Sequence, residues 1–227
     1  MPRIAKGRDR VLSREEIAAE TLRQFDTGAE APSIRALAAA LGVAPSAIYH
    51  HFESQAAIVQ AATELVWGEV ANDFLIAIPD PLDADPVEVL VTAGVVARRT
   101  FGHHYRIAPF LAASPEPDDF MTEVLSLLGV VFERLGLERE DAAVSFYAYA
   151  SFVIGTVLFS ATRRIANEQL GIAGEQPRGR RGSRRRKGPR GALEDAIDLP
   201  SRDPVLDEEL FSAALRRLVE SFVAPRR

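Results

Sequence analysis

Residues 33–52, SIRALAAALGVAPSAIYHHF, constrain the fold more than any other stretch of this 227-residue chain. Ser33 can accept a hydrogen bond from the first turn of a helix, as N-cap residues do. Ile34, Leu37 and Leu41 then follow at the three-to-four spacing that gives a helix one apolar face. The stretch therefore predicts a short helix that begins after Ser33 and packs against a neighbour on one side.

A tight turn and a second short helix should follow. Gly42 can take the left-handed conformation that ends a helix, and Pro45 suits the first position of the next one. This second helix is expected over about residues 45–51, with Ile48 and Phe52 facing inward four positions apart. A short helix with small and polar residues on its outer face fits the major groove of DNA. The residues expected on that face are Ser46, Ala47, Tyr49 and His50.

The same stretch carries a family pattern. It reads Ile34-x-x-Leu37-Ala38-x-x-Leu41-Gly42-Val43-x-x-Ser46-x-Ile48-Tyr49-x-His51-Phe52. With the apolar helix before it, it makes residues 12–60 resemble the DNA-binding domain of TetR-type transcriptional repressors. The resemblance implies an all-α fold: an N-terminal three-helix helix-turn-helix domain over residues 1–53, with a basic arm at 1–11, and a larger helical ligand-binding and dimerisation domain over residues 54–227.

The resemblance also implies roles for single residues. Small residues at the start of the second helix would lie at base edges, and Tyr49 and His51 would approach phosphates; alternatively, the Tyr49 ring packs under the turn and His51 caps the helix end. Arg35 fits a backbone or guanine contact. Gln55 stands where the family usually has Lys, which predicts a weaker salt dependence of DNA binding. The predicted DNA-binding residues are Ser33, Arg35, Pro45, Ser46, Ala47, Tyr49, His50, His51 and Gln55.

Charge is unevenly distributed along the chain. The net charge is -5, and eight of the 27 Lys and Arg residues lie within residues 178–190, so the remainder holds 19 basic against 32 acidic side chains. The arm at 1–11 could follow phosphates or be a frayed terminus. The segment at about 171–201 is rich in Gly, Pro and Arg and is predicted to be disordered. It could bind DNA or an acidic partner, cover a pocket, or be a tolerated insertion.

Helical patterns account for the rest of the chain. Ser13 and Glu16 form a capping box that should start the first helix, and Gly28 should end it. No alternating run demands a strand. Further helices are expected over residues 54–78, 87–101, 105–113, 120–135 and 204–223.

Residues 142–162 contain no charged side chain and are long enough to span a bilayer. A membrane anchor is one reading. The preferred reading is a helix packed in its own domain on one side and against a second subunit on the other. The resemblance implies the same, because the last two large helices of each TetR-type subunit form a four-helix bundle. A homodimer with no membrane contact is therefore expected.

The resemblance implies a small-molecule pocket in the larger domain, with a largely apolar effector. Core packing is the alternative role for each candidate residue. The adjacent pair His103-His104 is a poor chelating pair on a helix, so no metal and no cofactor are expected. The candidate ligand-binding residues are Phe101, His104, Tyr105, Phe110, Phe146 and Tyr149.

These expectations combine into one function. The resemblance implies a bacterial, ligand-responsive transcriptional repressor that binds a palindromic operator as a homodimer and is released by a small molecule; the alternative is a constitutive DNA-binding protein with no effector. The chain lacks phosphate-loop, HExxH and nucleophile-elbow motifs, so it is not expected to be an enzyme. It has no cysteine, and no apolar stretch follows its basic N-terminus, so a cytoplasmic location is expected.

Overall fold

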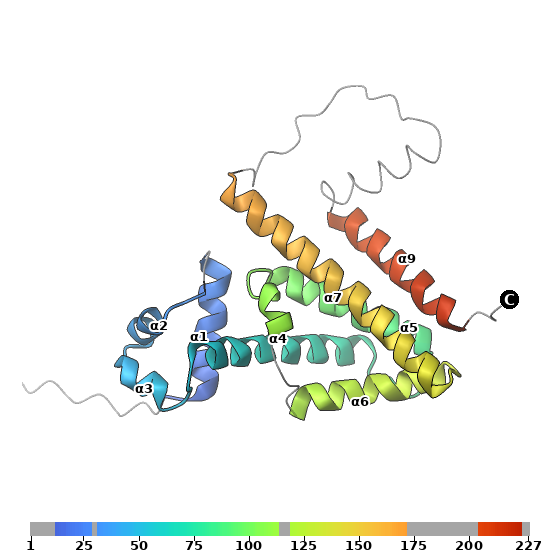
Figure 1. The fold of residues 1–227 in the computed structure, drawn as a ribbon, viewed down its shortest axis with the longest axis horizontal. Coiled ribbons are helices and arrows are strands. Elements are labelled where there is room, and N and C mark those ends of the chain that lie inside the picture. The colour runs from blue at the N-terminus through green and yellow to red at the C-terminus, as the bar shows by residue number, and fades with distance from the viewer. Residues whose placement is uncertain (1–11, 29–30, 114–118, 172–203, 224–227) are drawn as a thin grey trace, which may run out of the picture.

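The structure is a computed structural model that describes residues 12–28, 31–113, 119–171 and 204–223. Within these residues every regular element is a helix, which confirms the predicted all-α class (Figure 1). The basic arm and the Arg-rich segment, for which phosphate binding and disorder were predicted, lie outside the described residues apart from Gly171.

Three helices build the N-terminal domain: α1 (Arg14–Thr27), α2 (Ile34–Leu41) and α3 (Pro45–Tyr49). The predicted capping box at the start of α1 is confirmed. The Glu16 amide donates to Ser13 Oγ at 3.1 Å, and the Ser13 amide donates to a Glu16 carboxylate oxygen at 3.2 Å. Two otherwise unpaired N–H groups are thereby satisfied, so α1 has a well-defined first turn.

The remaining elements form the larger domain. They are α4 (Gln55–Ala77), α5 (Pro86–His103), the 3-10 helix η1 (Ala108–Ala113), α6 (Asp119–Arg134), α7 (Arg139–Gln169) and α9 (Pro204–Val223). The helix expected over residues 105–113 is the main disagreement, because only a 3-10 helix forms and it begins later. Pro109 has no N–H for an α-helical bond, and the Ile107 and Phe110 amides instead donate three residues back, at 3.0 and 2.9 Å.

Helix α4 belongs to two apolar cores. Near its start, Ile58 packs with the buried residues of the small domain. Further along, Val66, Val70 and Phe74 pack in the core of the larger domain, and Leu22 and Phe25 of α1 belong to that same core. Figure 1 shows α4 running from the small domain beneath α5 and α7. The first and fourth helices therefore connect the two parts of the molecule through buried contacts.

Helix α7 contains the charge-free segment and has two different faces. Tyr149, Val153 and Val157 are buried against the larger domain, whereas Tyr147 is 74% exposed and Phe159 is 67% exposed on the other side. Among the described residues this is the helix that is long and apolar enough to cross a membrane, a test that core helices of soluble proteins also pass. Its exposed side is largely apolar, as is typical of a surface that packs against another helix.

Helices α5, α7 and α9 meet at Gly94, in the middle of α5. A Cβ at this position would lie 2.5 Å from Leu215 Cδ2 of α9 and 3.1 Å from Val153 Cγ2 of α7. An ion pair at the surface also joins α5 and α9: Arg216 of α9 donates two hydrogen bonds to the Glu88 carboxylate of α5. These bonds hold the pKa of Glu88 below its ordinary value.

Gly94→Ala should destabilise the chain by about 1–3 kcal/mol, because the added methyl overpacks the contact between α5 and α9. Gly68→Ala is the matched control. Gly68 is also inside a helix, but a Cβ there meets nothing within 4 Å. That substitution should stabilise the chain by about 0.5–1 kcal/mol, since alanine is the better helix former. Urea unfolding of both variants measures the difference, and equal effects would contradict the packing described here.

Candidate DNA-reading surface and ligand cavity

The turn between α2 and α3 has the geometry expected from its residues. Ser33 Oγ accepts a hydrogen bond from the Ala36 amide at 3.2 Å, and Gly42 adopts φ 70° and ψ 29°. The left-handed glycine lets the Val43 amide donate back to the Ala38 carbonyl at 3.0 Å. Val43 packs partly buried against the small core, so the two helices are held at a fixed angle.

Helix α3 separates its inner and outer residues sharply. Ile48 is fully buried, and the next inward residue, Phe52, is 2% exposed. The helix ends at Tyr49 rather than His51, because the His51 and Phe52 amides both donate to the Ile48 carbonyl and tighten the last turn. Its outer face carries four of the predicted DNA-binding residues: exposed Ser46, Tyr49 and His50, and half-buried Ala47.

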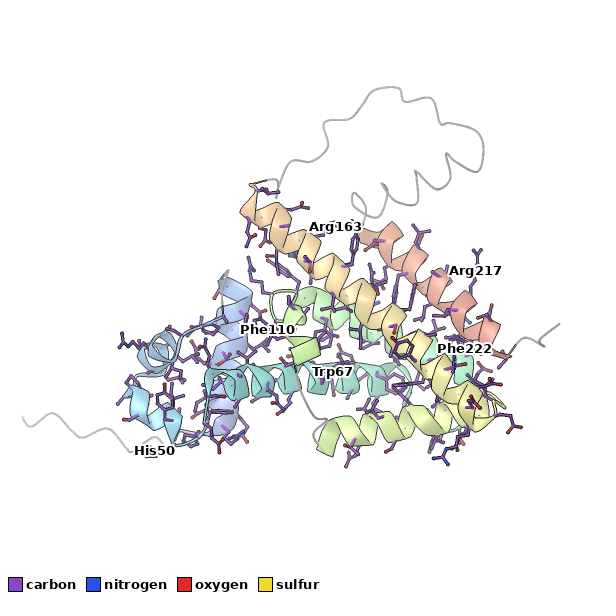
Figure 2. The ribbon with its side chains drawn as sticks, in the orientation of Figure 1. His50, Trp67, Phe110, Arg163, Arg217 and Phe222 are labelled. Carbon is purple, nitrogen blue, oxygen red and sulfur yellow. The ribbon has the colours of Figure 1, made fainter. Side chains whose placement is uncertain are left out.

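The outer face of α3 points away from the larger domain. Figure 2 shows His50 at the outer end of the small domain, far from α7 and α9. Tyr49 is 57% exposed, so its ring is available on the surface rather than packed under the turn. Ser33, Arg35 and Pro45 are also exposed, and His51 is half-buried. The tertiary structure thus leaves these residues accessible on α2, α3 and the turn that joins them.

The Gln55 side chain makes a hydrogen bond within the protein. Gln55 is the first residue of α4, and its Nε2 donates to the Pro32 carbonyl at 2.9 Å. This bond ties the start of α4 to the residue preceding the Ser33 cap. Ser54 caps α4 itself, since its Oγ accepts from the Ala57 amide at 3.1 Å. The Gln55 side chain therefore holds the start of α2 in place, separately from the DNA contact predicted for it.

Arg14 is a structural residue of this surface that the sequence reasoning did not single out. Its guanidinium lies 4.1 Å from the centre of the Phe52 ring and donates a hydrogen bond to the His51 carbonyl. It thus fastens the C-terminal end of α3 to the first turn of α1. An arginine directly after the Ser13 cap was the available sequence signal, but its partner lies 37 positions away.

The larger domain contains an apolar cavity of about 340 Å³ between α4, α5, α6 and α7. Its size and its walls suit a small organic molecule. Two of the six candidate ligand-binding residues line it, Phe146 and Tyr149. Other lining residues were not singled out from the sequence, because the four helices meet only in the folded chain. They include Trp67, Val70 and Phe74 of α4, Val89 and Ala93 of α5, and Val124 and Leu128 of α6.

The other four candidate residues are not among those that line the cavity. Phe101 packs edge-on against Trp67 at 4.9 Å, and Phe110 packs against Phe25 at 5.4 Å; Figure 2 places Phe110 beside α1. His104 lies between two carboxylates, and the Tyr105 hydroxyl donates to Glu168 at 2.6 Å. Phe101 and Phe110 thus pack in the core, and His104 and Tyr105 make polar contacts outside the cavity wall.

The cavity has few polar groups. Tyr149 is buried, and its hydroxyl donates to the Leu90 carbonyl at 2.8 Å. Burial raises the pKa of Tyr149 far above its ordinary value, so the phenol stays neutral. Glu123 is the charged residue of the described lining and is exposed. An uncharged, largely apolar molecule therefore fits these walls best.

A family model matches the N-terminal part of the chain. Residues 16–62 match the model described as "Bacterial regulatory proteins, tetR family". The match runs from α1 through α2 and α3 into the first turns of α4. No match to this chain was found among curated proteins.

Solved structures share the fold of most of the chain. The transcriptional regulator SCO7222, a TetR from Streptomyces coelicolor, is 21% identical with a TM-score of 0.66, covering 95% of this chain and 100% of its own. The TetR family protein ActR from Streptomyces coelicolor, in complex with actinorhodin, is 21% identical with a TM-score of 0.66, covering 94% of this chain and 96% of its own. BioQ with its double-stranded DNA operator is 20% identical with a TM-score of 0.57, covering 71% of this chain and 94% of its own.

Arg14→Ala should lower the free energy of unfolding by about 1 kcal/mol, because it removes a cation–π contact and a hydrogen bond that hold α3. The free energy of unfolding of Arg14→Lys should lie between those of the wild type and Arg14→Ala, since lysine keeps the charge without the planar donor group. Arg35→Ala, an exposed arginine on α2, serves as the control and should change stability by less than about 0.5 kcal/mol. Urea unfolding decides, and identical values for the two alanine variants would refute the role of Arg14.

Proposed function

We propose that this chain, whose N-terminal domain belongs to the tetR family of bacterial regulatory proteins, is a ligand-responsive transcriptional repressor. It binds a palindromic operator as a homodimer and is released from it by a largely apolar small molecule. The observation that carries the proposal is the outer face of α3, where Ser46, Tyr49 and His50 are exposed while Ile48 and Phe52 are buried. Such a helix can enter a major groove without disturbing its own core.

The proposed contacts follow from the size and chemistry of each side chain. Pro45, Ser46 and Ala47 are small, so the start of α3 can approach base edges closely. Tyr49 and His51 donate to phosphates on either side, and His50 stands at the rim of the groove. Ser33, Arg35 and Gln55 contact the backbone next to them from the starts of α2 and α4, where helix N-termini favour negative charge.

The second subunit is proposed to cover the exposed sides of α7 and α9. Tyr147, Ile154 and Phe159 of α7 and Leu210 of α9 are exposed apolar residues in the single chain. Figure 1 shows these two helices side by side along one edge of the molecule. Pairing them with a second copy would bury this surface and place two α3 helices on one duplex, about 34 Å apart. A soluble dimer of this kind works in the cytoplasm.

The cavity supplies a route from effector to operator. Its wall includes Trp67, Val70 and Phe74 of α4, while Ile58 at the start of the same helix belongs to the core of the small domain. A molecule that binds better when α4 is displaced therefore shifts the population toward a different placement of α3. The cavity favours a sensor over the alternative of a constitutive DNA-binding protein with no effector.

Selection of DNA fragments from a random duplex pool by the full-length chain tests the proposal. The enriched fragments should contain an inverted repeat whose half-sites are about one helical turn apart, bound by two chains. Recovery of random sequence, or binding by a single chain, would contradict it.

Tyr49→Phe should weaken operator binding by about 5–10-fold, because one hydroxyl contact to a phosphate is lost. Tyr49→Ala should weaken it further and should leave the stability of the fold within about 0.5 kcal/mol, since the ring lies on the surface. Gel-shift titration against the selected operator measures both. Ile76→Ala, which truncates an exposed apolar side chain on α4, is the control and should bind as the wild type does. Full affinity in Tyr49→Ala would exclude Tyr49 from the interface.

Ala150→Phe should fill the cavity, because Ala150 lies in its wall on α7. Binding of N-phenyl-1-naphthylamine, an uncharged apolar fluorophore, should become at least about tenfold weaker. The control is Ala40→Phe, which adds the same ring at an exposed position of α2. Fluorescence titration compares the variants with the wild type, and equal binding by all three would show that the probe does not use this cavity.

A further inference from the structure

The residues that follow α5 connect three helices. His104 is the C-cap of α5, and its side chain is 16% exposed. Its Nδ1 lies 3.1 Å from both carboxylate oxygens of Asp26 in the last turn of α1, and its Nε2 lies 3.0 Å from Glu69 Oε2 of α4. One imidazole ring therefore bridges the DNA-binding domain and the long helix that joins it to the larger domain.

Only the protonated ring satisfies both contacts. A neutral imidazole has one N–H donor and one lone pair, so one of its two nitrogens would face a carboxylate with no proton between them. The imidazolium ion donates from both nitrogens and is attracted by both negative charges. Both contacts of His104 are therefore hydrogen bonds only when the ring carries two protons.

Arg106 and Tyr105 extend this connection to α7. Arg106 donates to the Asp26 carbonyl at 3.3 Å and to Glu168 Oε2 at 2.7 Å. The Tyr105 hydroxyl donates to Glu168 Oε1, and burial together with this bond raises the pKa of Tyr105, so the donor is retained. The last turn of α1 is thereby joined to the last turn of α7, the helix proposed to carry the dimer contact.

We propose that His104 is a proton-sensitive positioning residue that fixes the DNA-binding domain relative to α4 and the larger domain. The hydrogen bonds of His104 to α1 and α4 are observed in the structure. Their effect on operator binding rests on the proposed function. Arg106, on the same segment as the ring, also contacts the end of α1 through the Asp26 carbonyl. Arg23 and Asp73 line a groove between α1 and α4 that Asp26 and Glu69 line too. Both direct partners of the ring are acidic.

The sign of the pH dependence follows from the two partners. While the ring carries two N–H protons and both carboxylates are ionised, both bonds are present. When a rise in pH removes one of the two ring protons, one bond is lost. The DNA-binding domain then becomes less firmly held at the end of α1.

Hydrogen exchange of the α1 amides over residues 22–27, measured on the full chain at pH 6.0 and 8.5 and corrected for intrinsic exchange rates, tests the proposal. Protection in the wild type should fall by about tenfold at the higher pH. His104→Gln should show low protection at both pH values. His104→Arg, which keeps a charge and several donors at any pH, should show high protection at both.

Two controls separate this role from a general effect of histidine. His103→Gln removes the exposed neighbour and should keep the response of the wild type. The double variant Asp26→Asn, Glu69→Gln removes both acidic partners of the ring, so it should abolish the pH response. An unchanged response in His104→Gln, or its loss in His103→Gln, would overturn the proposal.

The measurement uses no DNA, so it fails or succeeds independently of the proposed function. If the exchange results hold, operator affinity should fall between pH 6.0 and 8.5 in the wild type by more than in His104→Arg. The remaining histidines, His50, His51 and His103, are the same in both proteins, and the comparison cancels their contribution. An equal fall in both proteins would mean that the fastening does not affect DNA binding, and would overturn that part of the proposal.

Discussion

Helix α4 has to bury apolar side chains in two places at once, and the arrangement of the molecule follows from this. Its first turns complete the core of a small domain through Ile58, and its later turns complete the core of the larger one through Val66, Val70 and Phe74. Because close-packed cores resist deformation, a displacement of one end of α4 is transmitted to the other. The position of α3 relative to the larger domain therefore depends on what packs against α4 as far away as Phe74, about 24 Å from Ile58 along the helix axis at about 1.5 Å per residue.

The larger domain leaves two apolar regions uncovered by the described chain. One is the cavity, whose wall includes the buried Tyr149. The Tyr149 hydroxyl already donates a hydrogen bond to the Leu90 carbonyl. The other is the outer side of α7, where Tyr147 and Phe159 are exposed. The close approach of α5, α7 and α9 at Gly94 uses one side of α7 and leaves the side with Tyr147 and Phe159 exposed. A small molecule and a second subunit are their proposed occupants.

Polar contacts join the elements of the small domain to one another and to the larger domain. Arg14 fastens α3 to α1, Gln55 fastens α4 to the start of α2, and His104 fastens α1 and α4 to the end of α5. Each joins groups on different elements, and hydrogen bonds with charged groups depend strongly on distance and direction. Each bond therefore adds a directional constraint to the contacts made by the apolar cores.

The sequence alone determined the local structure: the capping box at Ser13, the left-handed Gly42, the proline start of α3 and the inward Ile48, because caps, turns and periodicity depend on neighbouring residues. It also indicated that Ser46, Tyr49 and His50 are exposed on α3. Tertiary structure decided the rest. Phe101 and Phe110 proved to be core residues and His104 a bridging residue, and the cavity is lined by four helices whose positions no local pattern records. Residues 59 positions apart, such as Leu90 and Tyr149, meet only when long-range packing brings their helices together.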